Sequence, residues 1–187
     1  MLVQLDRKRF TVTDFQQMIE TGILQEGYDR CELLNGEIIT MATIGRKHAS
    51  TVNRQTKLFH RILSETIIVS IQNPIELGPF SQPEPDLALL RWQDDYYESG
   101  YPKAEDVYLI IEVADTTLET DRTIKLPLYA QTGIVEVWIV NLQDNQIEVY
   151  RQPIENTYSI TQIFMKGDTL TIAALPEVTI AVSDILS

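Results

Sequence analysis

The stretch that decides the fold is 107-VYLIIEVADTTLETDRTIKLPLYAQTGIVEVWIV-140. Its two ends, 107–113 and 135–140, are apolar and rich in β-branched residues, which predicts two buried strands. The segment 118–131 between them has the length of a helix, and Gly133 follows at the usual position after a helix end. We expect this helix to form the crossover between two parallel strands of one sheet. Pro127 lies inside the expected helix, where a proline disrupts the backbone.

Glu112 interrupts the first of these apolar strands. A buried carboxylate is costly unless a positive group meets it. A second acid, Asp86, opens another apolar run in PEPDLALL, which predicts a neighbouring strand over 85–90. Lys125 follows on the expected helix. Two carboxylates on neighbouring strands and one lysine are the minimum set for metal-assisted hydrolysis of a phosphodiester.

Asp86 and Glu112 are therefore the candidate metal ligands, and Mg²⁺ or Mn²⁺ is the expected cofactor. Mg²⁺ prefers oxygen ligands and keeps several waters, so two carboxylates suffice, and the carbonyl of Val113 is a candidate third ligand. Lys125 would stabilise negative charge in the transition state or position the attacking water. It lies about two turns into the helix, or roughly 9 Å of rise, so a helix folded back over the sheet can return it to the acids.

Each of the three residues also has a simpler explanation. Asp86 can cap a turn, Glu112 can form an ion pair with an arginine such as Arg122, and Lys125 can be an exposed helix lysine. The two interpretations differ in one observable, which is whether Asp86, Glu112 and Lys125 converge in space.

The composition is typical of a soluble globular domain. The chain has 187 residues, of which 44% are hydrophobic and 22% are charged, so we expect one domain over 1–187 with its own core. No apolar run approaches the roughly 20 residues of a membrane span, and the N-terminus lacks the apolar core of a signal peptide. We expect a cytoplasmic protein without membrane contact. The single cysteine, Cys31, excludes an intramolecular disulfide and a thiolate metal cluster.

The formal net charge of −12 argues against a protein that coats nucleic acid, because such binding depends on neutralising phosphates. One basic segment, 46–61, contains no acid. If it is a helix, several of its basic side chains share one face. That face is either simply solvated or binds nucleic acid, and the candidate contacts are then Arg46, Lys47, Arg54 and Lys57.

The rest of the chain predicts a mixed architecture. Thr13 is expected to cap a short helix that ends at Glu20, and Asn35-Gly36 predicts a hairpin within CELLNGEIITM. Apolar residues at helical spacing predict a helix over 46–65. Further strands are expected at 66–77, broken at Pro74, at 146–152, and in the tail at 157–164, 169–175 and 178–182. Together these elements predict an α+β fold with a mixed central sheet flanked by helices.

The polar loop after the strand at 85–90 is rich in aromatic residues: Trp92, Tyr96, Tyr97 and Tyr101. Such side chains can stack on bases. They can equally form a packed flap or a contact between subunits, which leaves a homodimer open as the assembly.

In combination, PEPDLALL, IIEVADTTLETDRTIKLPLYAQTGIVEVWIVNL and ELLNGEIITM resemble the putative restriction-endonuclease family of the PD-(D/E)XK nuclease superfamily. The resemblance extends from Glu32 to Tyr150. Members share an acid in a Pro-Asp pair, a Glu-Val strand, a displaced lysine after an Asp-Arg pair, and a Gly-x-x-Glu-x-Trp strand. The last two correspond here to Asp121-Arg122 before Lys125 and to Gly133, Glu136 and Trp138. The resemblance implies a restriction endonuclease-like fold and a magnesium-dependent nuclease that acts on DNA, with Asp86, Glu112 and Lys125 as its catalytic residues.

The same resemblance implies auxiliary roles for Glu32, His48 and Gln72. Read without it, Glu32 can be a hairpin glutamate that faces solvent, and His48 can be a helix cap or a phosphate contact. The chain departs from the family where the usual Ser-Pro-Ser-Thr is Ala114-Asp115-Thr116-Thr117, and where the usual aspartate after the Trp strand is Asn141. The chain is also acidic and has no helix-turn-helix or zinc module for sequence readout, so a catalytically silent binding or assembly module that keeps the nuclease fold is the alternative function.

Overall fold

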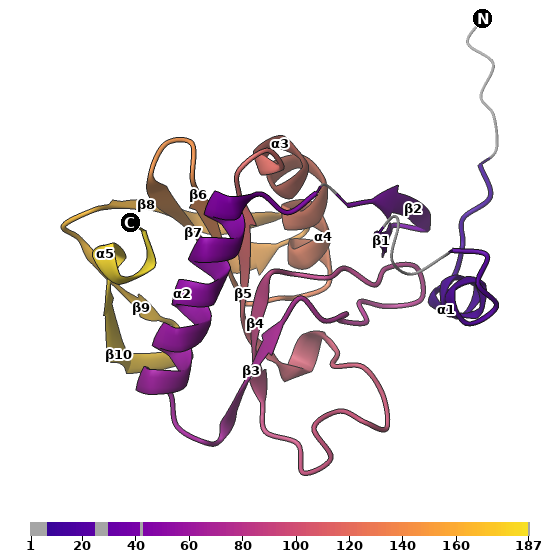
Figure 1. Cartoon of the computed structure of the whole chain (residues 1–187), viewed down its shortest axis with the longest axis horizontal. Helices are drawn as coiled ribbons and strands as arrows, with labels where there is room; N and C mark the ends of the chain where they lie inside the picture. The colour runs from indigo at the N-terminus through magenta and orange to yellow at the C-terminus, as the bar shows by residue number, and fades with distance from the viewer. Residues whose placement is uncertain (1–6, 25–29, 42, 187) are drawn as a thin grey trace, which may run out of the picture.

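A six-stranded mixed sheet forms the centre of the computed structural model, which describes residues 7–24, 30–41 and 43–186 (Figure 1). The strand order is β3-β4-β5-β6-β7-β8. β5 and β6 are parallel, and the other neighbouring pairs are antiparallel. The strands are β3 (Ile67–Ile71), β4 (Leu87–Arg91), β5 (Val107–Ala114), β6 (Glu136–Asn141), β7 (Gln146–Ile154) and β8 (Thr157–Met165). The predicted α+β fold and the predicted parallel pair are both confirmed.

The crossover between β5 and β6 is helical but not one regular helix. α3 (Leu118–Thr120) passes into η2 (Asp121–Lys125), a π-helical turn, and then into α4 (Leu126–Gln131). The Leu126 N–H donates to the Asp121 carbonyl, five residues back. In a regular helix the ring of Pro127 would clash with the carbonyl four residues before it, and the widened turn lies just where that conflict would arise.

The two faces of the sheet have different covers. α2 (Arg46–Ile62) packs on one face, together with β9 (Thr169–Ile172), β10 (Leu175–Ala181) and α5 (Val182–Ile185) near the C-terminus (Figure 1). α4 packs on the other face through residues such as Leu128 and Tyr129. Because side chains alternate along a strand, Ile111 and Val113 face the α2 core while Glu112 faces α4.

The N-terminal elements lie beside the sheet (Figure 1). α1 (Val12–Glu20) is capped by Thr11, so the prediction of Thr13 was wrong: Thr11 and Asp14 form a reciprocal capping box that fixes the start. β1 (Cys31–Leu34) and β2 (Glu37–Thr40) form the predicted hairpin around Asn35-Gly36. Backbone hydrogen bonds between Leu33 and Gln82 fasten this hairpin to the chain that leads into β4.

In the described part of the chain, no helix combines the length and the apolar character that crossing a membrane requires.

Candidate active site

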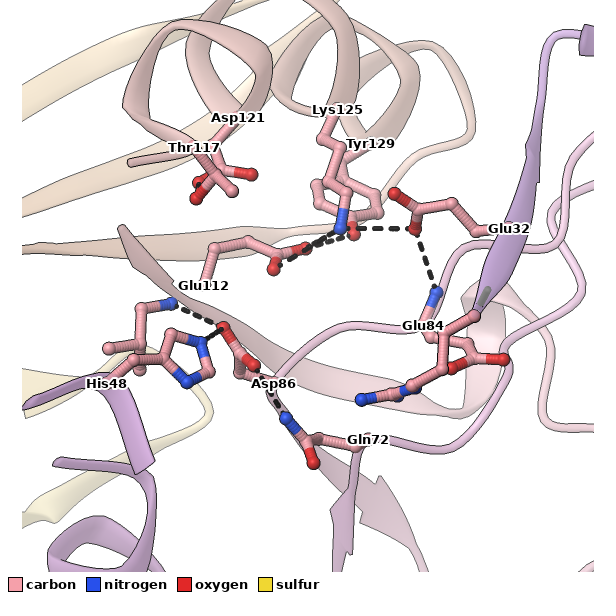
Figure 2. Close-up of polar contacts among 12 residues, drawn as sticks. Glu32, His48, Gln72, Glu84, Asp86, Glu112, Thr117, Asp121, Lys125 and Tyr129 are labelled. Carbon is pink, nitrogen blue, oxygen red and sulfur yellow. Dashed lines mark hydrogen bonds and ion pairs between the residues drawn. The ribbon is translucent and has the colours of Figure 1, made fainter. Parts of the chain in front are cut away.

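A pocket with a volume of about 280 Å³ lies where the hairpin, the start of α2, the end of β5 and the π turn meet (Figure 2). Its walls contain all six residues that were predicted to have catalytic or auxiliary roles: Glu32, His48, Gln72, Asp86, Glu112 and Lys125. The pocket is also lined by Asp115, Thr116 and Thr117, which belong to the segment that replaces the Ser-Pro-Ser-Thr of the family. Residues separated by 93 positions in the chain therefore share one small volume, from Glu32 to Lys125.

Asp86 lies one residue before β4, and three donors hold its carboxylate. Gln72 Nε2 donates to Oδ1 at 3.1 Å, and the Val113 N–H donates to Oδ2 at 2.8 Å. His48 Nε2 lies 3.0 Å from Oδ2. Burial alone would raise the pKa of Asp86, but the hydrogen bond and charge of His48 and the other two donors outweigh it and lower the pKa. Asp86 is held as a carboxylate, in one orientation, and is not a simple turn cap.

His48 lies in the first turn of α2 but does not cap it, because the N-cap is Gly45. The hydrogen bond to Asp86 raises the pKa of His48, and burial opposes this increase. The interpretation of His48 as a helix cap is therefore wrong, and its ring instead orients a carboxylate of the pocket.

Lys125 lies between two glutamates (Figure 2). Its Nζ is 3.1 Å from Glu32 Oε2 and 3.3 Å from Glu112 Oε1. The three side chains are buried, which overturns the alternatives of an exposed Lys125 and a solvent-facing Glu32. Burial alone would lower the pKa of Lys125, but the charges of Glu112, Glu32 and Asp121 raise it above its ordinary value. Lys125 is a fixed ammonium in the pocket.

The helical crossover supplies two further polar groups to the site. The Tyr129 hydroxyl donates to Glu112 Oε1 at 2.6 Å, and Thr117 Oγ1 donates to Asp121 Oδ2 at 2.7 Å. Burial raises the pKa of Asp121 to about 6, against the opposing charge of Lys125. The sequence analysis placed Asp121 in the Asp-Arg pair of the family pattern without a role at the site, and it did not identify Tyr129. Their spacing of four residues on either side of Lys125 was the available signal, because such positions share a helix face.

The pocket contains more negative than positive groups. Glu32, Asp86, Glu112 and Asp121 converge there, with Lys125 as the fixed cation. Burial raises the pKa of Glu112 well above its ordinary value; Lys125 opposes this, while Asp121, Asp86 and Glu32 reinforce it. An added cation would relieve that repulsion.

The donor set also fits a hydrated divalent metal. Among the residues described, no three His, Cys, Asp or Glu side chains are arranged to enclose an ion. Mg²⁺ needs no such cage, because one or two carboxylates and several waters complete its shell. Asp86 and Glu112 provide hard oxygen atoms of that type.

Arg122 does not pair with Glu112, so that alternative is wrong. It forms a bidentate pair with Glu148 on β7 instead. Asn141, the second departure from the family pattern, donates to Glu148 Oε1 at 3.0 Å. An aspartate there would repel Glu148, so this departure belongs to the Glu148 cluster and leaves the pocket unchanged.

The predicted nucleic-acid contacts on α2 lie outside the pocket. Arg46, Lys47 and Lys57 are exposed, and Arg54 is half-buried. Lys47 Nζ donates to the Leu142 carbonyl, so its charge is partly used within the fold.

Comparisons with known proteins identify the family and the fold of the chain. The profile of the Uma2 family, described as "Putative restriction endonuclease", matches residues 12–183. The chain belongs to this family. The search of curated proteins found no match. Among solved structures, the chain is similar to a putative nuclease belonging to DUF820 from Anabaena variabilis ATCC 29413, with a TM-score of 0.71 and 16% identity over 94% of this chain and 97% of that one. The Uma2 chain therefore shares its fold with that protein.

Proposed function

We propose that this Uma2 protein is a metal-dependent endonuclease that hydrolyses phosphodiester bonds of DNA. The observation that carries the proposal is that Asp86, Glu112 and Lys125 line one pocket, in which the buried ammonium of Lys125 lies 3.3 Å from Glu112 Oε1. Membership of a family described as "Putative restriction endonuclease" supports the same reaction class.

In this proposal Asp86 and Glu112 hold Mg²⁺ or Mn²⁺. The bound metal would lower the pKa of a water molecule and offset charge that develops on the phosphate. Lys125 adds a positive charge that is already in position, because Glu32 and Glu112 fix its ammonium. His48 and Gln72 keep the Asp86 carboxylate oriented, and Tyr129 does the same for Glu112.

Metal binding is tested by calorimetry with Mn²⁺. Because the pKa of Glu112 is raised, protons compete with a metal for its carboxylate over a wider pH range, so the affinity is expected to increase with pH. Titrations in two buffers with different ionisation enthalpies should give different observed heats. Glu148→Gln is the matched control, because it neutralises a second buried glutamate outside the pocket. Identical isotherms for the parent and Glu112→Gln would refute the ligand assignment.

Catalysis is tested by Mn²⁺-supported hydrolysis of single-stranded, duplex and branched DNA. Asp86→Ala should abolish both metal binding and cleavage. Cleavage that persists in Asp86→Ala would assign the activity to another site or to a contaminant.

The second candidate is a silent binding or assembly module with the nuclease fold. The closed arrangement Glu32–Lys125–Glu112 favours it, since each of these charges already has a protein partner. An absence of Mn²⁺ heats together with an absence of cleavage on every substrate would select this module over the nuclease.

A further inference from the structure

The proposed reacting groups lie below the protein surface. The exposed fractions are 9% for Asp86, 3% for Glu112 and 5% for Lys125. A phosphodiester must therefore enter the pocket to meet them. A pocket of about 280 Å³ admits a short segment of one strand. In a B-form duplex the two backbones are separated by grooves, the major one about 12 Å wide, so at most one backbone could enter the pocket while the other stayed outside.

α2 leads away from this pocket. Gly45 and His48, at its first residues, line the pocket, whereas Arg61 lies at the opposite end of the helix. The distance along the axis is about 22 Å for 15 residues at 1.5 Å each. Arg46, Lys57 and Arg61 are exposed and Arg54 is half-buried, and their spacing places them within one side of the helix.

The positive charge of this helix is available to a ligand. Among the residues that the structure describes, none of these four α2 side chains forms an ion pair, and α2 contains no acid. Several arginines outside α2, by contrast, already form ion pairs with acids of the protein: Arg30 with Glu84, Arg122 with Glu148, and Arg151 with Glu136.

A single helix presents one narrow row of charge. A duplex carries two phosphate backbones, and its binding requires neutralisation over a broader surface. The rest of this chain has a strong excess of acids, since the whole carries a net charge of −12. The net negative charge of the chain disfavours a second backbone, whereas one backbone can follow the basic side chains of α2.

We infer that the ligand of this site is single-stranded DNA, or a single-stranded flap, whose backbone enters the pocket and continues along the exposed side of α2. The inference rests on the proposed function for the chemistry but not for the binding. None of the four basic α2 residues is aromatic, so the strand would be attracted to them by charge rather than by stacking of its bases. With four phosphate contacts, the slope of log K against log salt should be about −3, and affinity should decrease about 50-fold between 50 and 200 mM salt.

Fluorescence anisotropy with a labelled single-stranded oligonucleotide, in EDTA, tests the binding without catalysis. The double variant Lys57→Ala/Arg61→Ala removes two contacts far from the pocket. It should weaken binding about 20-fold at 0.1 M salt and reduce the salt slope by about 1.4. The control Lys103→Ala/Lys166→Ala removes the same charge from exposed positions elsewhere and should change binding less than threefold. Thermal melting confirms that both variants are folded.

A blunt hairpin duplex of the same sequence is the competitor. It should compete at least tenfold more weakly than the single strand. Equal or tighter duplex binding would overturn the inference, as would equal losses in the two double variants. Single-strand binding along α2 without any metal-supported cleavage would uphold this inference and refute the nuclease. Cleavage that does not depend on Lys57 and Arg61 would uphold the nuclease and refute this inference.

Discussion

β5 and β7 each carry a buried glutamate, Glu112 and Glu148, and the same helical crossover supplies a cation to each. Lys125 lies beside Glu112, and Arg122, three residues earlier, lies beside Glu148. Tyr129 donates to Glu112 and Tyr150 donates to Glu148, at 2.6 and 2.8 Å. The two sites thus share a carboxylate, a cation and a tyrosine.

The pKa values of the two glutamates are shifted in opposite directions. Burial raises the pKa of Glu148, but hydrogen bonds from Arg122, Asn141 and other donors outweigh burial and lower the pKa to about 2. At Glu112, burial and three neighbouring acids raise the pKa well above its ordinary value. A carboxylate whose donors outweigh its burial is a structural ion pair, whereas one with several other acids nearby can be stabilised further by an added cation.

The largest expected effect is the loss of Lys125. Lys125→Ala should lower cleavage by about 10²–10³, because it removes a preorganised charge at the transition state. Mn²⁺ binding should be retained, since an ammonium is not a metal ligand. Single-turnover rates and calorimetry provide the two readouts. Lys166→Ala, in an exposed turn, is the silent control, and a Lys125→Ala enzyme with the parent's rate would remove Lys125 from the mechanism.

The second effect is on stability, where the two glutamates should respond differently. Glu148→Gln should lower the free energy of unfolding by about 2 kcal/mol, since it removes charged hydrogen bonds to Arg122 and Asn141. Glu112→Gln should lower it by less, within about 1 kcal/mol, because burial and the neighbouring acids already disfavour the charged form of Glu112 and offset its pairing with Lys125. Urea denaturation measures both. A larger loss in Glu112→Gln would reverse our interpretation of the two sites.

The third effect concerns the two tyrosines. Tyr129→Phe should weaken Mn²⁺ binding about tenfold, because a group that orients a metal ligand contributes indirectly to affinity. Tyr150→Phe removes the equivalent hydroxyl from Glu148 and should leave the Mn²⁺ isotherm unchanged. Equal effects of the two changes would show that the Tyr129 hydroxyl has no specific role at the pocket.

The smallest effect is the pH dependence of stability. Glu148 has a folded pKa of about 2, below its ordinary 4.5, so its contribution is complete above about pH 4.5 and is lost as the pH falls toward 2. Asp121, with a pKa raised to about 6, acts in the opposite sense: stability falls as the pH rises from its ordinary 3.8 through 6. Urea melts across this range should show a smaller decrease above pH 4 in Asp121→Asn. A parallel curve for Asp121→Asn would contradict the assigned pKa.

Much of this arrangement could be predicted from the sequence, because buried charge in an apolar strand has few explanations. Glu112 within VYLIIEV and Asp86 before LALL are anomalies of that type, and both lie in the pocket. It was harder to predict which cation pairs with Glu112. Arg122 and Lys125 are three residues apart on one helical segment, and only the width of its turns decides which of them faces Glu112.

Two other details depend on structure that local sequence does not specify. Thr11 and Thr13 both precede an apolar helical pattern, and the reciprocal bond with Asp14 selects Thr11. The burial of Glu32 depends on hydrogen bonds between Leu33 and Gln82, which are 49 positions apart in the chain. Long-range backbone pairing of this type has no signature in either segment alone.

The π turn at Asp121–Lys125 also has an evolutionary meaning. A π turn holds one residue more than the α-helical turn it replaces, so it is equivalent to a single-residue insertion into an ordinary helix. Deleting one residue such as Thr123 would restore an α-helical turn, and the flanking segments would keep their relative orientation because the shorter turn completes the same rotation. Arg122 and Lys125 would then be two residues, or about 200°, apart on a regular helix. One codon can therefore change the relative directions of the two cations that serve Glu148 and Glu112 without moving the rest of the crossover.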